Sequence, residues 1–69
     1  MHLNEQNMIA ILEKACETAG SQRAWSEANG LSPAFVNDVL QGKRGVTDRI
    51  AEALGYVKFT GFYKSNAHG

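Results

Sequence analysis

Cysteine is almost absent from the sequence, since Cys16 is the only one among 69 residues. A disulfide within the chain is therefore excluded, and so is a metal site built from several cysteines. Cys16 lies at helical spacing from Leu12 on the apolar side of its segment, so we expect a buried, unreactive thiol rather than a reactive one. The two histidines, His2 and His68, lie at opposite ends of the sequence.

Long apolar runs and catalytic signatures are missing too. No stretch approaches the ~20 apolar residues of a membrane span, and the start, MHLNEQNMIA, lacks the basic segment and apolar block of a secretory signal. We therefore expect a cytoplasmic protein. No histidine, cysteine or carboxylate cluster has the spacing of metal ligands or of a nucleophile and its base. We expect no enzyme, and no metal, cofactor or small-molecule ligand.

The sequence also lacks net charge, because seven lysines and arginines balance seven aspartates and glutamates. Many DNA-binding domains are clearly basic, so this balance argues against a nucleic-acid partner. The charges are unevenly distributed, however. Acidic residues gather near the start of the chain, and basic ones flank its central stretch: Arg23, Lys43, Arg44 and Arg49. One side of the molecule is therefore expected to be basic.

Proline occurs once, and its position marks a helix start. Pro33 follows Ser32, a favoured N-cap, and the fixed φ and missing N–H of proline suit the first helical position. Ser21 is a second N-cap, and Gly30 can end the helix that follows it. Residues 21–41 therefore predict two short helices joined by a tight turn.

The second of these helices, predicted from Pro33 to Gln41, has two chemically different sides. Apolar residues recur at helical spacing on one side: Phe35, Val36, Val39 and Leu40. The other side carries small or hydrogen-bonding residues instead of the long charged side chains of a solvated helix: Pro33, Ala34, Asn37, Asp38 and Gln41. Side chains of this kind can approach base edges in a DNA groove, and an ordinary solvated face is the alternative.

The stretch SQRAWSEANGLSPAFVNDVLQ resembles the helix-turn-helix of the lambda repressor and Cro-like superfamily. In that resemblance Gln22 begins the first motif helix, Gly30 lies in the turn and Gln41-Gly42-Lys43-Arg44 closes the second helix. The wider run GSQRAWSEANGLSPAFVNDVLQGKR is similar to short phage-type regulators, and the resemblance covers roughly residues 20 to 55. It implies one four-helix DNA-binding domain over residues 1–69 that acts in a bacterial or phage-infected cell.

Two positions differ from the pattern usual in that family. Ser26 stands where alanine is usual, and Asn29 stands where a larger apolar residue is usual. Helix packing at these two positions is therefore expected to differ. A buried Ser26 is expected to donate its hydroxyl proton to a backbone carbonyl, because buried polar groups are nearly always hydrogen-bonded.

Candidate DNA contacts follow from placing the second motif helix in the major groove. Asn37 is the best base reader, since its amide can donate to and accept from adenine, and Asp38 can either accept from cytosine or hold Arg44 or Lys43 in position. The other candidates for base contact are Pro33 and Ala34, toward a thymine methyl group, and Gln41, toward a base or a phosphate. Phosphate contacts are expected from Gln22, by its place in the family motif, and from Arg23, Ser32, Lys43 and Arg44.

Two further helices are predicted to support this motif. The first runs from about Asn4 to Ala19, and its inward side comprises Met8, Ile9, Leu12, Ala15, Cys16 and Ala19. The last follows Thr47, an N-cap, and covers 48–54, with Ile50, Ala51, Ala53 and Leu54 inward. Trp25, Phe35 and Val39 are expected in the shared core.

Residues 56–64, YVKFTGFYK, change to an aromatic and β-branched alternation that predicts a strand. Val57, Phe59 and Tyr63 are expected to share one face and to form a dimer interface, because a lone strand needs a partner and a second copy supplies one. Short Cro-like proteins are similar in using C-terminal β-structure to dimerise. A hairpin turning at Thr60-Gly61 is the alternative.

These features together lead us to expect a mainly helical, Cro-like repressor that binds a palindromic operator as a homodimer. The alternative function is a helix-turn-helix fold used for protein interaction, as in an antitoxin-like or inhibitory partner. Neutral net charge and an aromatic strand motivate this second interpretation.

Overall fold

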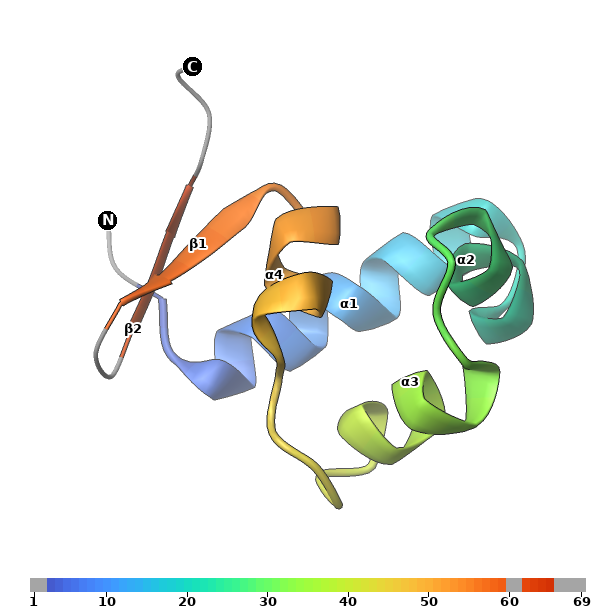
Figure 1. Cartoon of the computed structure of the whole chain (residues 1–69), viewed down its shortest axis with the longest axis horizontal. Helices are drawn as coiled ribbons and strands as arrows, with labels where there is room; N and C mark the ends of the chain where they lie inside the picture. Colours follow the sequence, from blue (N-terminus) through green and yellow to red (C-terminus); the bar gives the residue numbers. More distant parts are fainter. Residues whose placement is uncertain (1–2, 60–61, 66–69) are drawn as a thin grey trace.

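The computed structural model describes residues 3–59 and 62–65. Within these residues the chain forms four helices and one antiparallel hairpin (Figure 1): α1 (Glu5–Ala19), α2 (Gln22–Ala28), α3 (Pro33–Leu40), α4 (Asp48–Ala53), β1 (Tyr56–Phe59) and β2 (Phe62–Ser65). The prediction of a mainly helical chain is confirmed. Over the same residues, no helix has the length and apolar character that crossing a bilayer requires.

Each helix begins next to a side chain that caps it. The Ser32 hydroxyl accepts from the Phe35 N–H at 3.4 Å, and Pro33 occupies the first turn of α3. Asn4 caps α1 in a reciprocal pair with Asn7: each side chain accepts from the backbone N–H of the other, at 2.8 and 3.0 Å. Such caps satisfy N–H groups that have no partner within the helix, which is why short local patterns predicted these starts.

The core lies where α1 crosses the molecule, with the hairpin near one end and α2 near the other (Figure 1). Its buried residues come from every helix, from the α3–α4 loop and from β2: Met8, Leu12, Cys16, Trp25, Val36, Val39, Val46, Ile50, Ala51 and Tyr63. Phe35 is only half-buried at the edge of this core. The predicted inward positions Ala19 and Ala53 are wrong, because each is the last residue of its helix and is exposed there.

The C-terminal residues form a hairpin and not the single strand predicted over residues 56–64. Tyr56 pairs with Ser65 and Phe59 with Phe62, while the predicted turn at Thr60-Gly61 lies outside the described residues. The other edge of β2 pairs with Leu3: the Leu3 N–H donates to the Tyr63 carbonyl at 2.9 Å, and the Tyr63 N–H donates to the Leu3 carbonyl at 2.7 Å. The strand therefore finds its partners within its own chain.

The hairpin register also corrects the predicted dimer face. Cross-strand partners share one face of a sheet, and Tyr63 pairs with Lys58, whereas Val57 pairs with Lys64. Because odd-numbered residues of β1 pair with even-numbered residues of β2, Tyr63 lies on the opposite face from Val57 and Phe59. Tyr63 is 3% exposed and faces the core, so it is wrong as a dimer contact.

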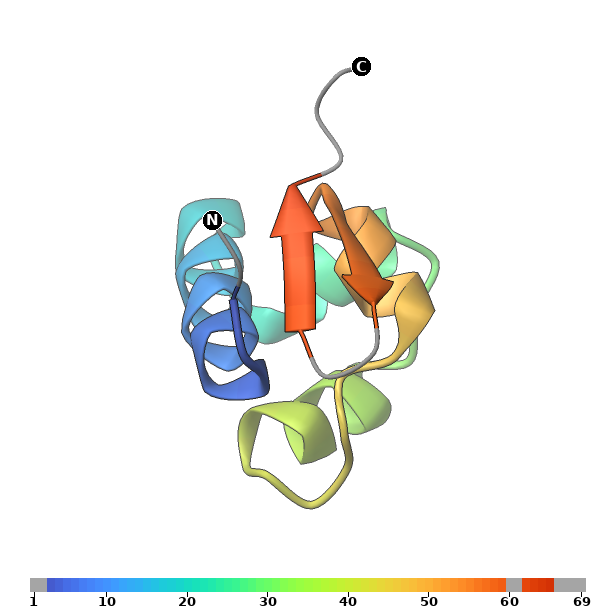
Figure 2. The ribbon, with the colours of Figure 1, turned by 90° about the vertical axis from the view of Figure 1, so that its left-hand side faces the viewer.

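Viewed from its outer side, the hairpin lies between α1 and α4, with β2 toward α1 and β1 toward α4 (Figure 2). Its outward face consists of Val57, Phe59, Phe62 and Lys64, and we call it the outer hairpin face. The rings of Phe59 and Phe62 stack with their centroids 5.4 Å apart, and Phe59 is 43% exposed. The stacked pair therefore presents one exposed ring, Phe59, beside the half-buried Phe62.

Candidate nucleic-acid interface

The turn between α2 and α3 is fixed by backbone and side-chain hydrogen bonds. Gly30 has a φ of +68°, a left-handed conformation that glycine adopts without steric cost. The Leu31 N–H donates to the Ser26 carbonyl at 2.8 Å. From α4, the Arg49 Nη2 donates to the Gly30 carbonyl at 3.4 Å. Arg49, one of the basic residues that flank the central stretch, therefore supports the turn.

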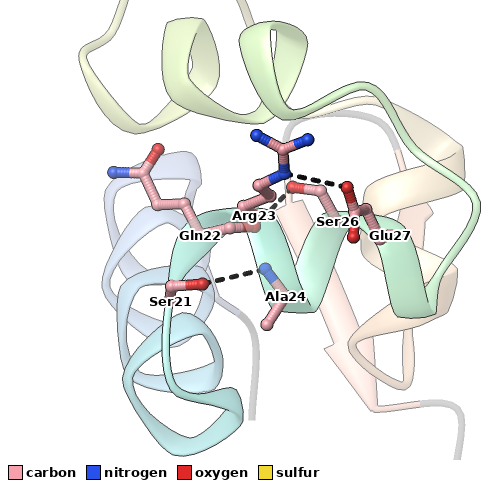
Figure 3. Close-up of polar contacts among 6 residues, drawn as sticks. All are labelled: Ser21, Gln22, Arg23, Ala24, Ser26 and Glu27. Atoms are coloured by element: carbon pink, nitrogen blue, oxygen red, sulfur yellow. Dashed lines mark hydrogen bonds and ion pairs between the residues drawn. The ribbon is translucent and has the colours of Figure 1, made fainter.

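Ser26 within α2 and Asn29 at its C-terminal end each find a backbone partner. Ser26 is fully buried, and its hydroxyl donates to the Gln22 carbonyl at 2.6 Å (Figure 3). The Asn29 side-chain amide donates to the Trp25 carbonyl at 2.8 Å. The partner predicted for Ser26 is thus confirmed, and neither polar side chain costs α2 an unsatisfied group.

The predicted base-reading residues lie on one side of α3, opposite the buried Val36 and Val39. Ala34 and Gln41 are exposed, and the other predicted residues are half-buried: Pro33, Asn37 and Asp38. The Gln41 side-chain amide donates to the Asn37 Oδ1 at 3.4 Å, so these two amides lie next to each other one turn apart. This side of the helix offers both donors and acceptors without a long flexible charged group.

An open hollow of about 430 Å³ lies beside this surface, between the end of α1, the start of α2 and the end of α3. Its lining brings Gln22 of α2 together with Asn37 of α3 and Gln41, the C-cap of α3. Figure 3 shows the Gln22 and Arg23 side chains projecting from α2 on the side where α3 lies. The structure therefore unites a predicted phosphate contact with two predicted base contacts.

The same hollow is acidic on its α1 side. Glu13 and Glu17 line it, as does Cys16, which is 4% exposed. Burial, and secondarily the negative charge of Glu13, raises the pKa of the Cys16 thiol, so the thiol stays protonated and the expected buried cysteine is confirmed. Two carboxylates near Gln22 disfavour an approaching phosphate, which sequence analysis did not anticipate.

The predicted phosphate-binding arginines each have a partner of their own. Arg23 Nε lies 2.9 Å from Glu27 Oε2, one turn along α2 (Figure 3). Arg44 Nε lies 3.3 Å from Asp38 Oδ2, so of the two roles predicted for Asp38 the contact with Arg44 is present. Lys43 is exposed, and only its backbone N–H contacts Asp38, donating to the carbonyl at 2.8 Å. Both arginine side chains are thus already in contact with carboxylates, which reduces the positive charge that they offer to a phosphate.

Ser32 and Phe35 complete the surroundings of α3. Ser32 is exposed and caps the start of α3, as predicted. Phe35 was expected in the core, but the Arg44 guanidinium lies over its ring, with Cζ 5.2 Å from the centroid. The sequence carries no signal for this contact, because it depends on how the loop after α3 folds back.

The chemistry offered here is hydrogen bonding and charge. In the described part of the chain, no three histidine, cysteine or carboxylate side chains lie close enough to share a metal ion. Comparison with protein-family models, curated proteins and solved structures gave no match for this chain. The functional proposal therefore depends on the geometry of α2 and α3.

Proposed function

We propose that this protein is a sequence-specific DNA-binding regulator, in which α2 and α3 form a helix-turn-helix of the lambda repressor and Cro-like type. The observation that carries the proposal is the outward side of α3. Its two amides, Asn37 and Gln41, line the same hollow as Gln22 of α2, and α3 itself carries no lysine, arginine or glutamate. That arrangement suits a helix lying in the major groove while its partner helix meets the backbone.

In this proposal, base contacts and phosphate contacts come from different parts of the motif. Asn37 pairs with adenine through its amide, Gln41 extends that strip of hydrogen bonds, and the small side chains of Pro33 and Ala34 admit a thymine methyl group. The residues assigned to phosphates come from α2, from the cap of α3 and from the loop after α3: Gln22, Arg23, Ser32, Lys43 and Arg44. Phosphate contacts fix the register of the protein on the duplex and carry no sequence information themselves.

The regulator is proposed to be a cytoplasmic protein that acts as a homodimer on a palindromic operator. It would repress transcription by occupying a promoter. The outer hairpin face supports this dimer: Val57 and Phe59 lie on it as predicted, and Phe62 takes the place assigned to Tyr63. Burying the exposed Phe59 ring against a second copy removes apolar surface from water. A two-fold dimer would present two α3 helices to two half-sites.

A binding selection tests the proposal directly. The purified protein is mixed with a randomised duplex pool at near-physiological salt, and the retained DNA is sequenced. We expect enrichment of a two-fold symmetric site, whose half-site spacing then reports the distance between the two α3 helices. A folded protein that enriches no sequence would contradict the proposal.

Protein interaction is the second candidate function, and the outer hairpin face also favours it. This face carries Val57 and two phenylalanine rings beside a single charged residue, Lys64, the net charge is zero, and Arg23 and Arg44 each contact a carboxylate. Salt dependence separates the two functions. Affinity for DNA falls steeply as salt rises, because counterions are released on binding, whereas an apolar protein contact changes little.

A further inference from the structure

Arg44 is held in place from two directions at the end of α3. Asp38 and Phe35 lie almost one turn apart on α3, and Arg44 reaches back to both from the loop that follows. Its Nε contacts the Asp38 carboxylate at 3.3 Å, and its Cζ lies 5.2 Å from the Phe35 ring centroid. The Lys43 N–H, donating to the Asp38 carbonyl at 2.8 Å, holds the start of that loop against the helix.

The geometry leaves the outer edge of this guanidinium available. A guanidinium has five N–H donors in one plane, and Asp38 is contacted through Nε. Within residues 3–59 and 62–65, no acceptor contacts Nη1 or Nη2 of Arg44, and its side chain is 57% exposed. These two nitrogens form the fork that binds two oxygens of a phosphate at once.

We propose that Phe35 and Asp38 are positioning residues that orient Arg44 for a DNA phosphate, and that Asp38 is not a base reader. This role rests on the proposed DNA-binding function. The ring and the carboxylate fix the plane of the guanidinium before DNA arrives, so less side-chain freedom is lost on binding. Arg23 differs, because Glu27 contacts it without an aromatic ring and its side chain is 78% exposed.

Two double-mutant cycles on a duplex test the role, because a phosphate contact is independent of sequence. Fluorescence anisotropy is measured on a labelled duplex of arbitrary sequence at low salt, and circular dichroism checks that each variant is folded. Phe35→Leu keeps the charge unchanged and should weaken binding by about threefold to fivefold when Arg44 is present. The F35L change should have no effect in an R44A background. The F35Y variant, which retains a ring, should bind the duplex as tightly as the unaltered protein.

Asp38→Ala gives the second cycle. In the R44A background it should tighten binding, because a carboxylate that holds nothing only repels phosphate. With Arg44 present, that gain should disappear. Removing Asp38 then removes not only a negative charge that repels phosphate but also the group that orients Arg44. Glu27→Ala is the matched control at the arginine without a ring, and we expect its effect to be independent of Arg44.

The outcomes separate this role from the proposed function. If F35L weakens binding equally in both backgrounds, or D38A tightens it equally in both, the positioning role is wrong while DNA binding stands. A D38A variant that loses preference at one base pair of a selected site would make Asp38 a base reader and overturn the role. An unaltered protein that binds no duplex overturns the proposed function, and this role with it.

Discussion

Asn37 borders the hollow next to Gln22, and its only side-chain partner in the described chain is the Gln41 amide at 3.4 Å. Replacing it therefore removes little from the fold. Under the proposed function, we expect Asn37→Ala to cost about 1–3 kcal/mol on the best site and to relax preference at one base pair, because a bidentate amide contact is lost. Affinities across a panel of single-base site variants measure both effects.

A matched amide that does not line this hollow is Gln6, which is exposed on α1. Gln6→Ala should leave both affinity and base preference unchanged. If N37A binds every variant of the site in the same order as the unaltered protein, Asn37 does not read a base.

Tyr63 couples stability to alkaline pH. Its hydroxyl donates to the Val46 carbonyl at 3.4 Å, and its pKa is raised above the ordinary 10.0 by burial and then by the charges of Glu5 and Asp48. As pH rises through 10, the unfolded state loses the phenolic proton before the folded state does. Stability that is fully present below pH 10 is therefore lost above it.

The variant Tyr63→Phe should reduce this alkaline loss, as measured by thermal unfolding between pH 8 and 11. At neutral pH it should cost roughly 1 kcal/mol, because the Val46 carbonyl loses its partner. Some alkaline loss should remain, since the pKa of Cys16 is also raised by burial. An unchanged pH profile would show that the pKa of the Tyr63 phenol is the same in the folded and unfolded states.

At the scale of elements, the sequence predicted those features that depend on interactions between residues close together in the chain. Ser21, Ser32 and Thr47 cap helices through hydrogen bonds to N–H groups three residues away, so a few neighbouring letters contain the signal. The hairpin depends on partners that sequence spacing does not identify, because Tyr63 pairs with both Lys58 and Leu3. Alternation alone could not distinguish one strand from two.

The candidate surface shows the same division. Helical spacing placed Asn37 and Gln41 on one side of α3, and chemistry alone predicted a carbonyl partner for Ser26. The Arg44 contact with Phe35 and the position of Glu17 beside Gln22 were not predictable, because each needs the relative placement of two elements. Such contacts depend on tertiary packing, which no short pattern contains.

Over the whole molecule, we expect the affinity for a DNA duplex to depend less on the zero net charge than on the positions of the carboxylates. Glu17 lines the hollow beside Gln22, so Glu17→Gln should strengthen duplex binding by about twofold to threefold at low salt and by less at high salt. Glu52→Gln on α4 changes the net charge equally but does not line the hollow, and should have a smaller effect. Equal gains from both variants would mean that only total charge matters.

Assembly is the second property of the whole molecule that can be tested. Phe59→Asp places a charge on the outer hairpin face, where it should prevent the proposed dimer because an unpaired charge is costly to bury. Light scattering should report monomers for F59D and dimers for the control Thr18→Asp, an exposed position in the last turn of α1. If F59D remains dimeric, the dimer interface lies on another surface of the molecule.

Val46, in the loop after α3, has both backbone polar groups held by distant side chains. Its N–H donates to the Glu5 carboxylate, its carbonyl accepts from Tyr63, and Tyr63 in turn pairs with Leu3. During synthesis, the contacts that Tyr63 makes with Val46 and with Leu3 must wait until Tyr63 has left the ribosome. Until then the nascent chain holds only short helices, which are marginal alone, and Glu5 of α1 can hold the loop after α3 but the hairpin cannot yet do so.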